Sequence, residues 1–295
     1  MFELPVTIEI PVIFTCNLTC RQCAHLSPYF PKETPPVPIE QIEKTCADWS
    51  NKITARHAVI MGGEPLLHPD IEQICRIFRR YWNHTAQIEV VTNGLLLDRM
   101  PPSFFETLAE YQIHCKITLH HKKFEKQINR NVQLLKSSFW IHNYTKDGDH
   151  LEKYHLRDGT PELFRSHAQD AYHLCFVKGI CTTLYENKLH HCSCLCYMQK
   201  AHALGVIDDA RVLNYKAATP DMTEEQLREW WTSDFHSVCE VCPERWVPVS
   251  SEEKFKGRDG SFQTADSSRE ESEVESAAVR RLPSAVFHET GLLTD

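Results

Sequence analysis

The chain has 295 residues, of which 42% are hydrophobic, enough for one barrel-sized domain and a smaller one. Its formal net charge is −8, and residues 251–295 hold ten acidic and six basic residues, so no basic stripe for a nucleic acid is present. No apolar run approaches the roughly 18 residues of a membrane span and no signal-peptide pattern opens the chain, so we expect a cytoplasmic protein without a membrane or nucleic-acid partner.

The chain holds thirteen cysteines, which is many for its length. Without an export signal, metal binding is a better account of them than disulfides. A first group lies near the N-terminus, and a second is crowded into residues 175–242. Cys46, Cys75 and Cys115 stand alone, and we expect them to be small buried apolar residues.

The first predicted element is a buried strand over residues 6–14, a β-branched and mostly apolar stretch. It leads directly to Cys16, Cys20 and Cys23, spaced four and three residues apart. Thiolates at this spacing can each bind one iron of a four-iron cube and leave the fourth iron open to a ligand from solution. Structural or zinc-binding thiols are the alternative, but a zinc knuckle usually pairs two CxxC or CxxH units.

Residues 28–38 are rich in proline and cannot form a helix or a central strand. Apolar residues at helical spacing predict a helix from residue 39 to 49, and a second strand follows over 56–61. This strand runs into the tetrad Gly62, Gly63, Glu64 and Pro65. Glycines let backbone approach a ligand closely and a carboxylate can hold an ammonium group, although a plain strand–helix turn would look similar.

Further strands are predicted at 88–92, 115–119 and 139–144, with helices between them. This alternation favours a parallel sheet with right-handed crossovers. Because five such units fit before Cys175, we expect an α/β fold that is a partial TIM-like barrel of about five to six units. Polar residues at the strand ends are candidates for the pocket: Thr92, Asn93, Thr118 and His120.

The second group of cysteines surrounds a predicted β-hairpin. Residues 182–191 form two short strands around Glu-Asn-Lys, with Cys175 before the hairpin and Cys192 at its end. Downstream, Thr223 and Gln226 predict a capping box for a helix, and Cys239 and Cys242 follow as a CxxC pair.

The CxxxCxxC loop followed one βα unit later by Gly-Gly-Glu-Pro resembles the radical S-adenosylmethionine (SAM) superfamily. The resemblance implies that Cys16, Cys20 and Cys23 bind a [4Fe–4S] cluster whose open iron takes the amino and carboxylate groups of SAM. It implies that the tetrad binds the SAM amino group and that the polar strand ends contact SAM. A flavodoxin or ferredoxin would supply the electron that cleaves SAM to methionine and a 5′-deoxyadenosyl radical, which abstracts hydrogen from substrate. In one departure, Gln22 stands where many members carry an aromatic residue.

The second group is similar to the twitch domain, a shortened SPASM domain that binds one auxiliary [4Fe–4S] cluster in some radical SAM enzymes. The resemblance implies four ligands: Cys175, Cys192, Cys239 and Cys242. Cys181 could replace Cys175, and a zinc site or two clusters are alternatives. The resulting domains are a partial barrel over 1–170, a twitch-like auxiliary domain over 171–247, and a disordered tail over 248–295.

The N-terminal stretch resembles radical SAM enzymes that modify aminoglycosides, the group of neomycin C epimerase. This implies epimerisation of a sugar carbon of a small, polar, cationic substrate, with a thiol returning hydrogen to the opposite face. The candidate donors are Cys181, Cys194 and Cys196, among which the sequence does not select. A dehydrogenase that passes an electron to the auxiliary cluster is the runner-up. A peptide maturase would need a leader-binding domain, for which we expect no room, and a simple electron carrier would not need Gly-Gly-Glu-Pro.

Overall fold

The computed structural model describes residues 1–250, except residues 5, 146–149, 176, 179 and 234–235. All described residues lie in one compact unit, Met1–Gln263. The boundaries expected after residues 170 and 247 stay predictions, and almost all of the tail expected to be disordered lies outside the described residues.

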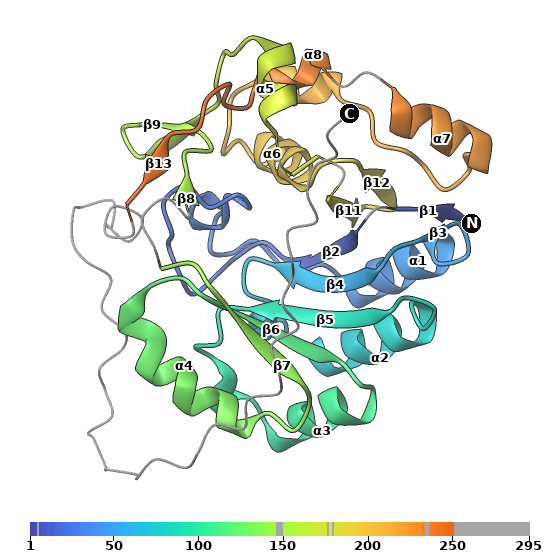
Figure 1. Cartoon of the computed structure of the whole chain (residues 1–295), viewed down its shortest axis with the longest axis vertical. Helices are drawn as coiled ribbons and strands as arrows, with labels where there is room; N and C mark the ends of the chain where they lie inside the picture. Colours follow the sequence, from blue (N-terminus) through green and yellow to red (C-terminus); the bar gives the residue numbers. More distant parts are fainter. Residues whose placement is uncertain (5, 146–149, 176, 179, 234–235, 251–295) are drawn as a thin grey trace, which may run out of the picture. The chain divides into compact units, whose positions relative to one another are not determined.

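A seven-stranded sheet forms the centre of the molecule, in the order β12-β11-β2-β4-β5-β6-β7 (Figure 1). Its strands are β2 (Thr7–Ile13), β4 (His57–Gly62), β5 (Gln87–Thr92), β6 (His114–Leu119), β7 (Phe139–Asn143), β11 (Cys181–Tyr185) and β12 (Lys188–His190). Every neighbouring pair is parallel except β11 and β12. The α/β class and the partial barrel predicted from the alternating pattern are therefore confirmed.

The helices are α1 (Ile39–Trp49), α2 (Ile71–Tyr81), α3 (Pro102–Glu110), α4 (Glu125–Asn131), α5 (Ala168–Leu174), α6 (Ser193–Ala203), α7 (Glu224–Thr232) and α8 (His236–Cys239). Of these, α1, α2 and α3 lie together on one side of the sheet (Figure 1). Short 3-10 turns are η1 (Ser27–Tyr29), η2 (Pro65–Leu67), η3 (Leu97–Arg99), η4 (Lys122–Phe124), η5 (Val132–Leu134) and η6 (Ala210–Asn214). The predicted capping box at the start of α7 is present, because Thr223 and Gln226 each bond the other's backbone.

Three two-stranded ribbons accompany the main sheet. They pair β1 (Phe2–Glu3) with β3 (Ile53–Thr54), β9 (His155–Arg157) with β10 (Thr160–Glu162), and β8 (His150–Leu151) with β13 (Pro248–Val249). The β8–β13 pair matters for the site, because it joins the segment after the barrel to the segment that follows the CxxC pair.

The predicted hairpin is β11 and β12, whose turn residues Glu186 and Asn187 both have positive φ, at 49° and 58°. Two left-handed residues are what a type I′ turn requires, and asparagine adopts that region readily. The hairpin does not stand apart from the barrel. Because β11 pairs in parallel with β2, it extends the barrel sheet by two strands.

The two faces of the sheet differ in chemistry. Ile8, Ala58 and Ile88 lie in register and are fully buried, which places the apolar core between the sheet and its helices. The neighbouring row, which faces the other way, reads Thr183, Glu9, Val59, Glu89 and His114 across the register. The sheet therefore has a polar face opposite the one that packs on α1, α2 and α3.

Candidate functional site

The cysteine loop begins where β2 ends. Cys20 is buried, and Cys16 and Cys23 are half-buried. Burial raises the pKa of the Cys16 thiol, and the nearby Glu64, Cys20 and Cys23 raise it further. The three sulfurs are therefore close enough to interact electrostatically. The backbone N–H of Leu18 donates to Cys16 Sγ at 3.3 Å and lowers the pKa of this thiol, which opposes part of the rise.

The tetrad Gly-Gly-Glu-Pro fixes this loop by backbone contact. Gly63 N donates to Ile13 O at 2.7 Å, and Glu64 N donates to Thr15 O at 3.0 Å. A Cβ on Gly62 would lie 2.1 Å from Ile13 O, and one on Gly63 would lie 2.0 Å from Thr15 O. The glycines are therefore needed for the close approach of β4 to the cysteine loop itself.

The Glu64 carboxylate joins two strand ends. Its Oε1 accepts from Thr92 Oγ1 at 2.6 Å and from Leu66 N at 3.1 Å, while Oε2 accepts from Asn93 N at 2.9 Å. The side chain is 1% exposed, and burial raises its pKa to about 7. The sequence offered this carboxylate as a partner for an ammonium group, whereas the fold uses both oxygens internally. Pro65 starts η2 and is buried.

The polar strand ends divide into two groups. Asn93 donates from Nδ2 to Asn17 Oδ1 at 2.7 Å and to Cys16 Sγ at 3.8 Å, so the end of β5 touches the cysteine loop. Thr118 lies inside β6, in register with His142 of β7, and His120 follows the strand. Both are half-buried on the adjoining part of the sheet.

Gln22, the departure from the family pattern, binds a distant segment. Its Nε2 donates to Tyr154 O at 2.9 Å, and its Oε1 accepts from Lys153 N at 2.6 Å and Tyr154 N at 3.2 Å. Its φ of 60° lies in the left-handed region, which a non-glycine residue rarely adopts. Tyr154 is 1% exposed, and its hydroxyl donates to Cys23 O at 3.4 Å. The glutamine thus brings a ring to Cys23 from another part of the chain.

His25, just after the third cysteine, connects the loop to α6. Its Nδ1 donates to Gly62 O at 2.7 Å, and its ring stacks on Tyr197 with 4.3 Å between centroids. Burial lowers the pKa of His25 to about 4, so the ring is neutral at neutral pH. Sequence reasoning missed both His25 and α6, because nothing in the local pattern marks a contact 172 residues away along the chain.

Four cysteines of the second group lie around one cavity. This small cavity is lined by Cys175, Cys192, Cys239 and Cys242, and most of its remaining wall is apolar, from residues such as Leu195. Four thiols around a dry cavity fit the ligand set of one iron–sulfur cluster. Cys181 is not among the lining residues, so the geometry favours Cys175 as the fourth ligand.

Within the part of the chain that the structure describes, no three His, Cys, Asp or Glu side chains are placed to hold one metal ion.

The three remaining thiols of the region have different surroundings. Cys194 accepts a hydrogen bond from Cys192, which lowers the pKa of Cys194 to about 7. Cys196 is 1% exposed on α6. Cys181 is half-buried on β11, in register with Thr7, at the edge of the polar face.

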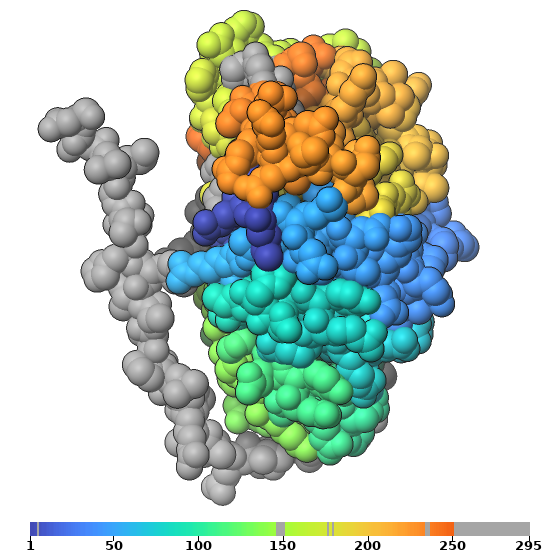
Figure 2. Space-filling model, turned by 90° about the vertical axis from the view of Figure 1, so that its right-hand side faces the viewer, coloured from blue at the N-terminus to red at the C-terminus, as the bar shows by residue number. Residues whose placement is uncertain are grey.

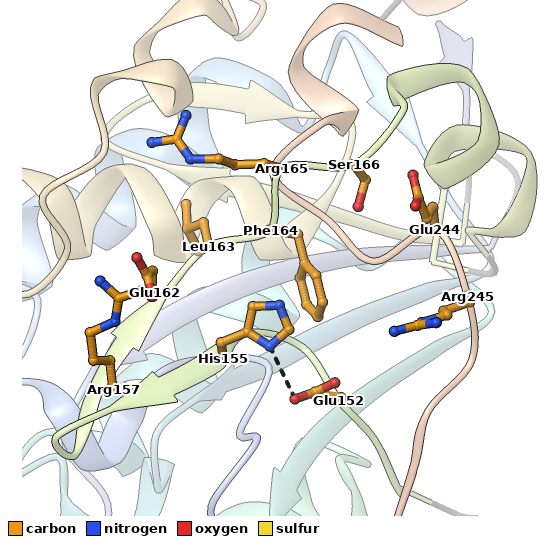
Figure 3. A pocket seen from close by; sticks show the side chains of 10 residues that line it. All are labelled: Glu152, His155, Arg157, Glu162, Leu163, Phe164, Arg165, Ser166, Glu244 and Arg245. Atoms are coloured by element: carbon orange, nitrogen blue, oxygen red, sulfur yellow. Dashed lines mark hydrogen bonds and ion pairs between the residues drawn. The ribbon is translucent and has the colours of Figure 1, made fainter.

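A separate cavity of about 520 Å³ lies at the surface between the β9–β10 ribbon and the segment after Cys242 (Figure 3). Its walls are charged, but the charges pair locally: Arg157 with Glu162 at 3.1 Å and His155 with Glu152 at 3.3 Å. Figure 2 shows another face of the molecule, where the N-terminal strand β1 lies against α7. None of the described helices is long and apolar enough to cross a membrane.

Comparison with known proteins agrees with this site. Residues 10–135 match the sequence profile of the radical SAM superfamily, and the match includes both the cysteine loop and the tetrad. Residues 10–135 are therefore similar to a radical SAM domain. GTP 3′,8-cyclase of Chlorobaculum tepidum is 32% identical over 127 residues, which are 42% of this chain and 36% of that protein. The match thus spans about a third of the length of this relative.

Two solved structures are similar at lower identity. BtrN, crystallised with AdoMet and 2-DOIA, is 14% identical, with a TM-score of 0.47 over 84% of this chain and 100% of its own. SuiB of Streptococcus suis, bound to S-adenosylmethionine, is 14% identical, with a TM-score of 0.43 over 81% of this chain and 72% of its own.

Proposed function

We propose that this chain is a radical SAM enzyme that epimerises one carbon of an aminoglycoside or another sugar, with a cysteine thiol as hydrogen donor. The observation that carries the proposal is the backbone contact between the tetrad and the cysteine loop, because it fixes three thiols at the carboxyl end of a parallel sheet. The superfamily match over residues 10–135 supports the same chemistry.

The chain's residues fit the groups that this reaction needs. Cys16, Cys20 and Cys23 would hold a [4Fe–4S] cluster that, when bound and reduced, supplies the electron for cleavage of SAM. Asn93 and the backbone of the tetrad set the position of that loop. The four thiols of the second cavity would hold an auxiliary [4Fe–4S] cluster, and a flavodoxin or ferredoxin would be the external reductant.

The polar face of the barrel supports a small, polar, cationic substrate. Two acidic side chains, Glu9 and Glu89, lie on this face and are 7% and 4% exposed. Glu89 lies 3.4 Å from His57 Nδ1, and Lys116 on the same face lies over the Trp140 ring at 4.6 Å. Hydroxyl and ammonium groups of an amino sugar find both acceptors and donors on such a surface.

The proposal is tested with reduced, reconstituted protein and SAM. The wild type should form 5′-deoxyadenosine, and Cys16→Ala, Cys20→Ala and Cys23→Ala should each abolish it. Cys75→Ala is the control, because Cys75 is a lone buried thiol in α2 that should not affect cleavage. Retained 5′-deoxyadenosine formation in any of the three loop variants would refute the assignment.

The auxiliary cavity favours one second candidate, a dehydrogenase of a sugar alcohol or aminocyclitol. Four thiols beside the barrel would hold a cluster able to accept an electron from a substrate radical. The two candidates differ in product. Epimerisation in deuterated water places deuterium at the inverted carbon, because an S–H proton exchanges with solvent, whereas dehydrogenation gives a ketone without solvent deuterium.

A further inference from the structure

A buried polar cluster lies under α6, where β11 joins β2. The parallel pairing sets Cys181 opposite Thr7 and Thr183 opposite Glu9, on the polar face of the sheet. Glu9 is 7% exposed, and the Cys181 thiol lies within hydrogen-bonding reach of its carboxyl group. A carboxyl group and a half-buried thiol therefore meet at the edge of the barrel interior.

Two oxygens in this cluster have no hydrogen-bond partner among the described residues, Glu9 Oε2 and Tyr197 Oη, while the Thr183 side chain lies within hydrogen-bonding reach of Glu9. Tyr197 is fully buried. Burial raises the pKa of its hydroxyl group, and the charge of the nearby Glu9 contributes to the rise. Most buried polar groups in folded proteins are hydrogen-bonded, so these oxygens can accept or donate a further hydrogen bond. Burial raises the pKa of Glu9 to about 7, so this carboxyl group keeps a proton to near neutral pH.

The surroundings also separate Cys181 from the other candidate donors. The Cys194 sulfur accepts a hydrogen bond from Cys192, which lines the second cysteine cavity. Cys196 lies on α6 and is 1% exposed. Cys181 is half-buried, and burial together with Glu9 raises its pKa, so it stays a thiol. A hydrogen-atom donor must keep its S–H bond until it reacts, and this site favours that form.

We propose that Cys181 is the hydrogen-atom donor and that Glu9 returns the proton to it after each turnover, an inference that rests on the proposed epimerase function. The S–H bond of Cys181 breaks and a C–H bond forms on the substrate radical, which leaves a sulfur radical. One electron from a ferredoxin-type reductant converts this radical to the thiolate. The O–H proton of Glu9 then moves to sulfur and restores the thiol, and water reprotonates the Glu9 carboxylate.

Turnover in deuterated water tests the two roles separately. Cys181→Ala should still form 5′-deoxyadenosine but give no deuterated epimer. Glu9→Gln, which is isosteric but carries no acidic proton, should give about one equivalent of epimer per chain and then slow by about 10²-fold. Thr182→Val is the matched control, because Thr182 is fully buried on the opposite face of β11 and should behave as wild type.

Infrared spectroscopy of the cluster-free protein gives a readout that does not depend on activity. The carbonyl band of the protonated Glu9 should vanish in Glu9→Gln and shift in Cys181→Ala. Glu64, the other buried glutamate whose pKa is raised to about 7, should keep its band in Cys181→Ala. The band shift in Cys181→Ala tests the contact between Cys181 and Glu9 by itself. This measurement therefore remains valid if Glu9→Gln fails to fold.

The outcomes are distinguishable. Wild-type turnover without 5′-deoxyadenosine, or with a ketone as product, defeats the proposed epimerase. If the epimer forms, then a deuterated product from Cys181→Ala overturns its role as donor. Unchanged multiple turnover in Glu9→Gln, or unchanged carboxyl bands in Cys181→Ala, overturns the role of Glu9.

Discussion

Replacing Gly63 with alanine should destabilise the contact between β4 and the cysteine loop. The cause is a steric clash of the new Cβ, and the change in backbone flexibility is a smaller effect. The added Cβ would lie 2.0 Å from Thr15 O, against 3.4 Å for an ordinary contact, so β4 and the loop must separate by about 1.4 Å. The hydrogen bonds of 2.7 and 3.0 Å between these segments cannot survive that movement. Their loss costs about 1 kcal/mol each, and overpacking adds about 1–3 kcal/mol, for a total of about 3–5 kcal/mol.

The assay is urea unfolding of the reduced, cluster-free protein, followed by iron content after reconstitution. Gly205→Ala is the matched control, because Gly205 has a φ of +69° and nothing lies within 4 Å of its added Cβ. It should lose only the roughly 1–2 kcal/mol of a left-handed alanine and bind iron as wild type does. If Gly63→Ala loses no more free energy of unfolding than Gly205→Ala and keeps its iron, the steric reasoning is wrong.

Three further predictions concern the clusters, the glutamine and pH. Anaerobic reconstitution should give about eight irons per chain, and about four once the three loop cysteines are alanine; zinc in the second site would refute the auxiliary cluster. Gln22→Leu should lose about 2 kcal/mol of stability, since three hydrogen bonds disappear, whereas exposed Gln133→Leu should stay within about 0.5 kcal/mol; equal losses would contradict this. Because burial raises the pKa of Glu64 from 4.5 to about 7, its protonated form stabilises the fold fully below pH 4.5 and that stability is lost as the pH rises through 7. Unfolding in urea at pH 5 and pH 8 should therefore show a smaller pH dependence for Glu64→Gln than for wild type, and an equal dependence would show that Glu64 is ionised in the fold.

The order of strands and helices was predictable because it rests on local signals. Apolar periodicity located β2, β4, β5, β6 and β7, and the capping box located the start of α7. The hairpin was predictable for the same reason, since Asn187 at its turn accepts the left-handed conformation. The convergence of four distant cysteines on one cavity was predictable only through the family resemblance, because spacing alone does not say which thiols meet.

Other features of the site depend on contacts that no local pattern records. The pairing of β11 with β2 joins residues about 174 positions apart, and it alone brings Cys181 beside Glu9. In the sequence, Gln22 only differs from the aromatic residue that is common at this position. Its role becomes visible in the fold, where residues 153 and 154 donate hydrogen bonds to its side chain. Glu64 was predicted to bind an ammonium group because a carboxylate suits one, and only the fold shows that its carboxyl group also accepts from Thr92 and Asn93.

These contacts also connect the two cysteine groups through the backbone. Gln22 holds Lys153 and Tyr154, and the adjoining β8 pairs with β13, which follows the CxxC pair (Figure 1). Ser166 N donates to Glu240 O at 3.0 Å, inside that CxxC pair. The proposed reaction needs a fixed separation between the two cysteine groups, and positions held within about 0.5 Å come from packed and hydrogen-bonded supports. The bonds of Gln22 and the β8–β13 ribbon supply such a support, so the glutamine that departs from the family pattern ties the first cysteine loop to the segment that carries the second group.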